Sequence, residues 1–352
     1  MKSLTTSKSK FKTFRRGLSD LATSTPVELI KTGFLGEPEI LPLVIEPNIA
    51  DVDLSDWAAS NREYLDDLLF KYGALLFRGF SVESVAEFES FATAIWPELF
   101  GEYGDLPSED EGKKVYHSTP YPPDKTILFH NESSHMHCWP MKQWFYCVKP
   151  SEQRGETPIV DCRKIYQSLD HDIRDLLEEK GLTYVRTFLE GLDVSWQQFF
   201  MTEDKGSVEE YCQRSDIEFK WLEGGGLKTS QSCPAIVRHP RTNEKSFFNQ
   251  VQLHHVSFLE PEVRQSLSSI YGEENLPRNV YLGDGTPIPD EVMARIGELY
   301  WENSVQFTWQ KGDIVMVDNM LVAHARNPYV GERKIVVAMG QMINKEDVVQ
   351  AN

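Results

Sequence analysis

The sequence lacks any long apolar run. It contains no stretch of about 18 apolar residues that could cross a membrane, and no apolar segment of a secretory signal peptide. Its five cysteines are odd in number and show no C-x-x-C spacing, which excludes a zinc ribbon and is typical of free thiols in a reducing compartment. These absences predict a cytoplasmic protein without a disulfide framework.

Basic residues are also scarce, because 36 Lys and Arg stand against 54 Asp and Glu and the formal net charge is −18. Nucleic acids and anionic membranes both require a basic face, so we expect neither as a partner. Six of the basic residues lie within residues 1–16, which contain no acid. We interpret residues 1–40 as an N-terminal extension, basic at its start. A solvated terminus is favoured over an organelle transit peptide, because Lys outnumbers Arg there and no amphipathic pattern follows.

The chain has 352 residues, 40% of them hydrophobic, which is enough for a large core. Apolar spacing predicts helices at 55–72, 82–99, 163–180, 261–271 and 290–304. It predicts short strands at 74–80, 142–148, 306–309, 313–318 and 334–339. This pattern predicts a mainly β fold with helical decoration, a double-stranded β-helix (jelly roll). We expect one domain over residues 41–345, with a lid-like insertion at about 190–232, where no strong period is seen.

One short apolar stretch, Thr126–Glu132, ends in a histidine and a carboxylate two residues apart. Side chains at i and i+2 of a strand share a face, so His130 and Glu132 should point at one common atom. An imidazole and a carboxylate are two thirds of the 2-His-1-carboxylate triad, which holds Fe(II) and leaves positions open for other ligands. Composition alone supplies about one such pattern by chance, so the prediction needs a third ligand.

Several histidines are weak candidates for that third ligand. His135 and His137 would form a zinc cluster with His130, but they fall in an expected loop, and we interpret them as supporting the ligands or facing a substrate. His254 and His255 are adjacent and would point apart on a strand.

His324 is the stronger candidate, because it lies in an expected loop after the strand-and-turn segment Gly312–Asn319. Arg333 follows shortly afterwards, and a guanidinium near a metal can clamp one end of a dicarboxylate whose other end chelates the metal. Arg326 and Lys334 are further candidates for a carboxylate contact, or plain surface charges, and we favour the surface for Lys334.

Taken together, the Phe129–Glu132 motif, the Gly155–Pro158 turn, the Gly312–Asn319 segment, His324 and Arg333 resemble a known family. They are similar to the Fe(II)/2-oxoglutarate dioxygenases of the taurine dioxygenase (TauD/TfdA) and clavaminate synthase-like superfamily. The resemblance runs from about residue 40 to residue 343, and its specificity lies in the order and spacing of the whole set.

The resemblance implies roles at matching positions. His130, Glu132 and His324 would be the catalytic iron ligands. Thr157 and Arg333 would bind the distal carboxylate of 2-oxoglutarate, the co-substrate that is consumed together with O2. The carboxylate ligand is Glu132, as in the clavaminate-like branch. The position four residues beyond Lys334, where taurine dioxygenase has a sulfonate-binding arginine, is Ala338, so a sulfonate substrate is not expected.

Within this superfamily the chain most resembles stand-alone amino-acid hydroxylases of nonribosomal-peptide pathways. That implies hydroxylation of a free amino acid, or of an aminoacyl group tethered to a peptidyl carrier protein, in secondary metabolism. The net charge argues for a free cationic substrate, because carrier proteins are usually acidic. Desaturation or ring closure on the same scaffold is an alternative. Outside the class, the alternatives are a zinc hydrolase and an inactive jelly-roll binding protein; retention of all three ligands and Arg333 disfavours the inactive protein.

Overall fold

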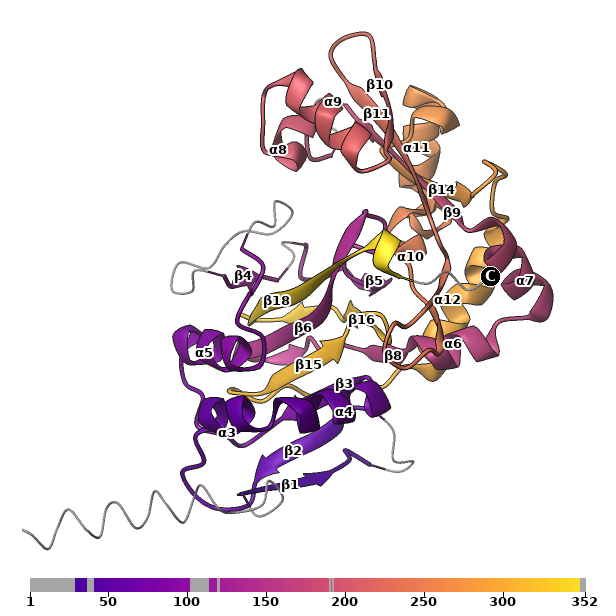
Figure 1. Ribbon diagram of the computed structural model, residues 1–352. Coiled ribbons are helices and arrows are strands. Elements are labelled where there is room, and N and C mark those ends of the chain that lie inside the picture. The colour runs from indigo at the N-terminus through magenta and orange to yellow at the C-terminus, as the bar shows by residue number, and fades with distance from the viewer. Residues whose placement is uncertain are drawn as a thin grey trace, which may run out of the picture.

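The computed structural model describes residues 29–36, 41–101, 114–118, 121–189, 191 and 193–348. It is mainly β with helices around the sheets, as predicted (Figure 1). The basic start of the chain lies outside the described residues. Among the residues that are described, no helix is both long enough and apolar enough to span a membrane.

The largest sheet has seven strands in the order β1-β2-β3-β15-β6-β18-β4. Only β2 and β3 run parallel; the other neighbours are antiparallel. The described part of the predicted extension contributes β1, whose Ile30 is buried. The strands are β1 (Ile30–Gly33), β2 (Leu43–Pro47), β3 (Ala74–Phe77), β4 (Tyr116–His117), β6 (Cys138–Lys149), β15 (Ile314–Asp318) and β18 (Lys334–Asn344).

Three helices cover one face of this sheet: α3 (Leu54–Ser60), α4 (Arg62–Tyr72) and α5 (Val85–Ile95) (Figure 1). The single helix predicted for 55–72 is therefore two helices. The N-cap of α3 is Asp53, whose side chain accepts a hydrogen bond from the backbone N–H of Asp56 at 2.9 Å. Asn61 separates the two helices: its backbone leaves the helical region, and its side chain caps the carbonyl of Trp57 at 2.7 Å.

The other face of the large sheet packs against a three-stranded sheet in the order β5-β16-β8. Its strands are β5 (Ile127–His130), β8 (Ile159–Asp161) and β16 (Val322–Arg326). Alternation along β3 shows the two faces: Leu75 and Phe77 pack under the helices, whereas Leu76 packs between the sheets with Ile159 and Val322. His324 therefore lies in a strand and not in a loop, because β16 pairs with both β5 and β8.

The predicted insertion at 190–232 forms regular structure together with its neighbours. Its hairpin extends a four-stranded sheet in the order β10-β11-β9-β14. Figure 1 shows its helices and hairpin as a lobe above the two facing sheets. The lobe has its own apolar cluster, in which Phe188, Trp196 and Leu227 are buried. The elements are β9 (Leu182–Phe188), α8 (Trp196–Phe200), α9 (Lys205–Arg214), β10 (Glu218–Trp221), β11 (Leu227–Cys233) and β14 (Arg278–Leu282).

The remaining elements connect these layers. The helix predicted for 163–180 is divided by the turn at Leu169–Asp170 into α6 and α7. The strand predicted for residues 306–309 is not found, although Phe307 and Trp309 pack between the sheets. The helices are α6 (Cys162–Ser168), α7 (His171–Lys180), α10 (Val251–His254), α11 (Pro261–Tyr271) and α12 (Asp290–Asn303), with short 3-10 turns at Val256–Phe258, Glu273–Asn275 and Lys345–Asp347. The short strands are β7 (Gln153–Arg154), β12 (Ile236–Arg238), β13 (Lys245–Phe247) and β17 (Tyr329–Val330).

Gly73 joins α4 to β3 and touches the strand that carries His324. Its φ is +77°, and a Cβ built there would lie 2.7 Å from Cγ2 of Val322. We expect Gly73→Ala to lower the free energy of unfolding by about 2 kcal/mol, from left-handed strain and steric overlap together. Urea unfolding measures this, with Gly33→Ala as the control, because no atom lies within 4 Å of a Cβ at Gly33. Equal stability of the two variants would contradict the prediction.

Candidate metal centre

The structure brings His130, Glu132 and His324 together. One ligand atom from each lies within 4.8 Å of the others, and all three residues are buried. His130 is the last residue of β5 and pairs directly with His324 on β16. No other group of three such side chains with this spacing occurs among the residues that the structure describes. Two imidazoles and a carboxylate at this separation can hold one metal ion.

The surroundings of the two imidazoles suit metal ligands. Nδ1 of His130 lies 2.8 Å from the carbonyl oxygen of Leu128, to which it can donate, and this leaves the Nε2 lone pair for a metal. Burial, followed by the neighbouring His130, lowers the pKa of His324 well below its ordinary value. Nδ1 of His324 is buried without a hydrogen-bond partner. A buried ring nitrogen of this kind, next to a second imidazole and a carboxylate, fits a metal ligand set.

Glu132 lies just beyond the strand, in a turn where Ser133 has a φ of +56°. Its carboxylate accepts a hydrogen bond from the side-chain amide of Gln143, on β6, at 3.4 Å. Its backbone N–H and carbonyl are both bound by the side chain of Asn319, at 2.7 and 2.9 Å. The sequence did not predict a role for Gln143 or Asn319. Asn319 is the last residue of the family-like Gly312–Asn319 segment, and this was the one feature of the sequence that pointed to it.

Thr157 and Arg333 form a second polar group. Nη2 of Arg333 donates to Oγ1 of Thr157 at 3.3 Å, and its Nε donates to the carbonyl of Gly155 at 2.9 Å. The indole N–H of Trp309 also donates to Thr157, at 3.1 Å. Burial, followed by the charge of Arg326, lowers the pKa of Arg333 to about 10. The guanidinium is therefore still charged at neutral pH and its charge is poorly compensated, which suits an anionic ligand.

Arg326 is not a surface charge. It is buried, and its guanidinium donates to the carbonyls of Tyr121, Pro122 and Lys125, so it holds the loop before β5.

Ala338 does not report on the substrate. It packs on the side of the large sheet that faces the helices, whereas its neighbour Val337 faces the interior between the sheets. The identity of residue 338 therefore does not bear on whether a sulfonate binds, contrary to the prediction.

His135 and His137 lie in a turn, as predicted, and are not part of the metal-binding group. Burial lowers the pKa of His135 to about 3, with further contributions from the charges of Arg186 and Arg278. The ring of His137 contacts the lobe, 5.6 Å from the ring of Tyr211 on α9, whereas the ring of His135 lies 5.9 Å from that of Tyr184 on β9. The lobe therefore reaches the segment that follows Glu132.

The sequence profile described as taurine catabolism dioxygenase TauD, TfdA family matches residues 39–339. The chain belongs to this family. The predicted resemblance is thereby confirmed, and the protein is a 2-oxoglutarate-dependent non-haem iron dioxygenase that uses Fe(II), 2-oxoglutarate and O2. The buried imidazoles, the carboxylate and the poorly compensated arginine fit these groups.

The dioxygenase has relatives over most of its length. It is 38% identical to the dapdiamide synthesis protein DdaC of Enterobacter agglomerans, over 85% of this chain and 93% of that protein. It is 30% identical to a clavaminate synthase-like protein of Arabidopsis thaliana, over 86% and 94% of the two chains. The structure of PvcB from Pseudomonas aeruginosa superposes with a TM-score of 0.53 at 15% identity, covering 93% and 95% of the chains, so the two share a fold.

Proposed function

We propose that this dioxygenase holds Fe(II) through His130, Glu132 and His324. The observation that carries the assignment is their convergence: three buried ligand atoms within 4.8 Å from two neighbouring strands and the turn after one of them. The ligand set leaves the remaining iron positions open for exogenous ligands. The zinc hydrolase alternative relied on His135 and His137, which lie outside this group.

Arg333 and Thr157 are the proposed anchor for the distal carboxylate of 2-oxoglutarate. A guanidinium presents two parallel N–H donors to a carboxylate, and the Thr157 hydroxyl adds a third polar contact beside it. When bound, iron and 2-oxoglutarate supply the oxygen-activating chemistry. The protein's own residues orient the co-substrate, hold the imidazoles in place and exclude water from the centre.

The two facing sheets are the proposed jelly roll of a single domain, and the lobe at 190–232 is its proposed lid. Two contacts support the lid. The Tyr211 ring lies beside His137. The side-chain amide of Gln231, in the orientation that satisfies its hydrogen bonds, donates to the backbone carbonyl of His135 and accepts from the backbone N–H of His137. Both histidines follow Glu132 closely in the chain, so the lobe contacts the segment next to the metal centre.

If the lobe is a lid, substrate should protect it from proteolysis. We expect limited proteolysis of the metal-free protein to cut first within 190–232, and the cut to slow in the presence of Fe(II), 2-oxoglutarate and a substrate identified by turnover. Mass spectrometry of the fragments locates the cuts. Initial cleavage elsewhere, or no slowing on substrate addition, would contradict the lid.

The proposed reaction is hydroxylation of an amino acid or a carrier-tethered aminoacyl group in secondary metabolism. The similarity to a dapdiamide synthesis protein over nearly the whole chain supports this substrate class. The net charge of −18 favours a free cationic amino acid over an acidic carrier protein. Desaturation or ring closure is the alternative outcome on the same scaffold.

The deciding experiment is a substrate screen that follows succinate release under air. Free amino acids, aminoacyl groups loaded on a carrier protein, taurine and a fatty acid are compared, and products are identified by mass. We expect succinate release coupled to the addition of one oxygen atom to an amino-acid or aminoacyl substrate. Coupled turnover of taurine or the fatty acid, with no response to any amino acid, would refute the proposed substrate class.

A further inference from the structure

The backbone N–H and the backbone carbonyl of Glu132 are both bound by one side chain, that of Asn319. Asn319 accepts from the N–H of Glu132 at 2.7 Å, and its amide nitrogen donates to the carbonyls of Glu132 and Pro140, both at 2.9 Å. Its own carbonyl accepts from the side chain of Asn131 at 2.7 Å. Asn319 is fully buried. The position of the Glu132 carboxylate therefore depends on where Asn319 is placed.

The preceding residue, Asp318, connects the same turn to the third ligand. One of its carboxylate oxygens accepts from the backbone N–H groups of Met320 and Leu321, at 2.9 and 3.1 Å. Strand β16 begins at Val322, directly after Leu321, and carries His324. The Asp318–Asn319 turn thus holds Glu132 on one side and starts the His324 strand on the other.

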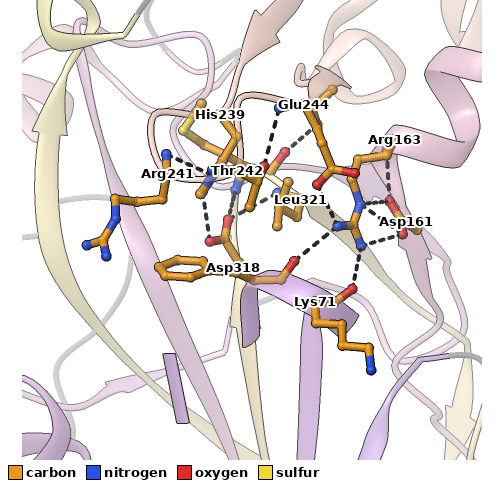
Figure 2. Close-up of polar contacts among 12 residues, drawn as sticks. Lys71, Asp161, Arg163, His239, Arg241, Thr242, Glu244, Asp318 and Leu321 are labelled. Atoms are coloured by element: carbon orange, nitrogen blue, oxygen red, sulfur yellow. Dashed lines mark hydrogen bonds and ion pairs between the residues drawn. The ribbon is translucent and has the colours of Figure 1, made fainter. Parts of the chain in front are cut away.

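A buried histidine outside the metal centre fixes this turn. Nε2 of His239 lies 3.0 Å from the second carboxylate oxygen of Asp318, and both side chains are almost completely buried (Figure 2). Nδ1 of His239 accepts from the backbone N–H groups of Arg241 and Thr242, at 3.3 and 3.1 Å. Because Nδ1 is the acceptor, the ring proton lies on Nε2 and is donated to Asp318.

We propose that His239 is a positioning residue of the iron centre. One of its ring nitrogens donates a hydrogen bond and the other accepts, which fixes one tautomer and one ring orientation. The ring in turn fixes the Asp318 carboxylate that shapes the turn. The Asp318–Asn319 turn then sets the separation between Glu132 and His324. The inference rests on the proposed function, because it assigns to His239 an effect on iron that is bound by these two residues.

Two near-isosteric variants separate this role from simple packing. His239→Gln places an amide N–H near the position of Nε2 and keeps the donor to Asp318, whereas His239→Asn keeps an acceptor near Nδ1 and loses that donor. In anaerobic Fe(II) titrations we expect His239→Asn to bind iron about tenfold more weakly, in the range seen for supporting partners of metal ligands. Its Fe(II)–2-oxoglutarate charge-transfer absorption should shift, and His239→Gln should restore both properties.

Loss of stability alone is controlled by Leu65→Ala, a cavity variant in the core on the helix side of the large sheet. It should lower the melting temperature without changing iron affinity or the absorption band. Wild-type iron affinity and absorption in His239→Asn would overturn the proposal, as would equal defects in the Gln and Asn variants.

If His239→Asn does not fold, Asp318→Asn answers the same question. It retains an oxygen for the Met320 and Leu321 amides, but it turns a donor toward the His239 N–H, and it should weaken iron binding to the same degree. Unchanged iron affinity in this variant would overturn the proposal. Failure of the proposed function is distinguishable, because it would appear as normal iron affinity in Glu132→Ala.

Discussion

His324→Ala should abolish turnover and most of the iron binding. The substitution removes one of three protein ligands, and Ala cannot replace the imidazole nitrogen. Loss of a partner that only supports a metal ligand costs about 10- to 100-fold in affinity, so loss of the ligand should cost more than about 100-fold. Anaerobic Fe(II) titration and 2-oxoglutarate-dependent oxygen uptake measure the two effects.

The matched control is His135→Ala, which removes a half-buried imidazole close in sequence to the centre but outside the ligand group. It should retain iron. Wild-type iron affinity and activity in His324→Ala would exclude His324 as a ligand. Loss of iron in His135→Ala, together with retention in His324→Ala, would instead favour a cluster of His130, His135 and His137.

Arg333→Ala should sharply raise the 2-oxoglutarate concentration needed for half-maximal turnover. Removing the charged partner of a buried carboxylate costs about 2–5 kcal/mol, which corresponds to roughly 30- to several thousand-fold in affinity. Arg333→Lys should recover only part of the loss, because an ammonium cannot pair with a carboxylate as a fork. Titration of 2-oxoglutarate at fixed iron gives the comparison.

Lys149→Ala is the control for the loss of nearby positive charge. Lys149 is exposed and pairs with Glu332, the residue before Arg333, so its removal should leave the 2-oxoglutarate requirement unchanged. An unchanged requirement in Arg333→Ala would move the assignment to Lys334 or Arg326. Arg326 already donates to three backbone carbonyls.

The sequence was informative where local chemistry decides the structure. A histidine and a carboxylate two residues apart, a distant histidine and a following arginine indicated the family from the sequence alone. The strand argument for His130 and Glu132 was only half right, because β5 ends at His130 and Glu132 lies in the turn. The side chain of Asn319 binds the backbone of Glu132 in this turn, and this contact spans 187 residues of sequence.

Other features were unpredictable because they depend on tertiary pairing. The segment around His324 contains few residues with a high strand propensity. It forms β16 because it pairs with β5 on one side and β8 on the other. His239 had no partner pattern in the sequence, since its partner Asp318 lies 79 residues away. Local propensity could not indicate either contact.

The separation of the proposed iron ligands along the chain also sets the order of events during synthesis. His130 and Glu132 leave the ribosome as an incomplete pair, and roughly 190 further residues must follow and fold before His324 can join them. A ligand that binds only the native chain stabilises it by about 2.7 kcal/mol when present at 100 times its Kd. The complete set of three ligands is therefore available to iron only after β16 has joined β5, and scarcity of iron during growth should lower the amount of this enzyme that escapes degradation as well as its activity.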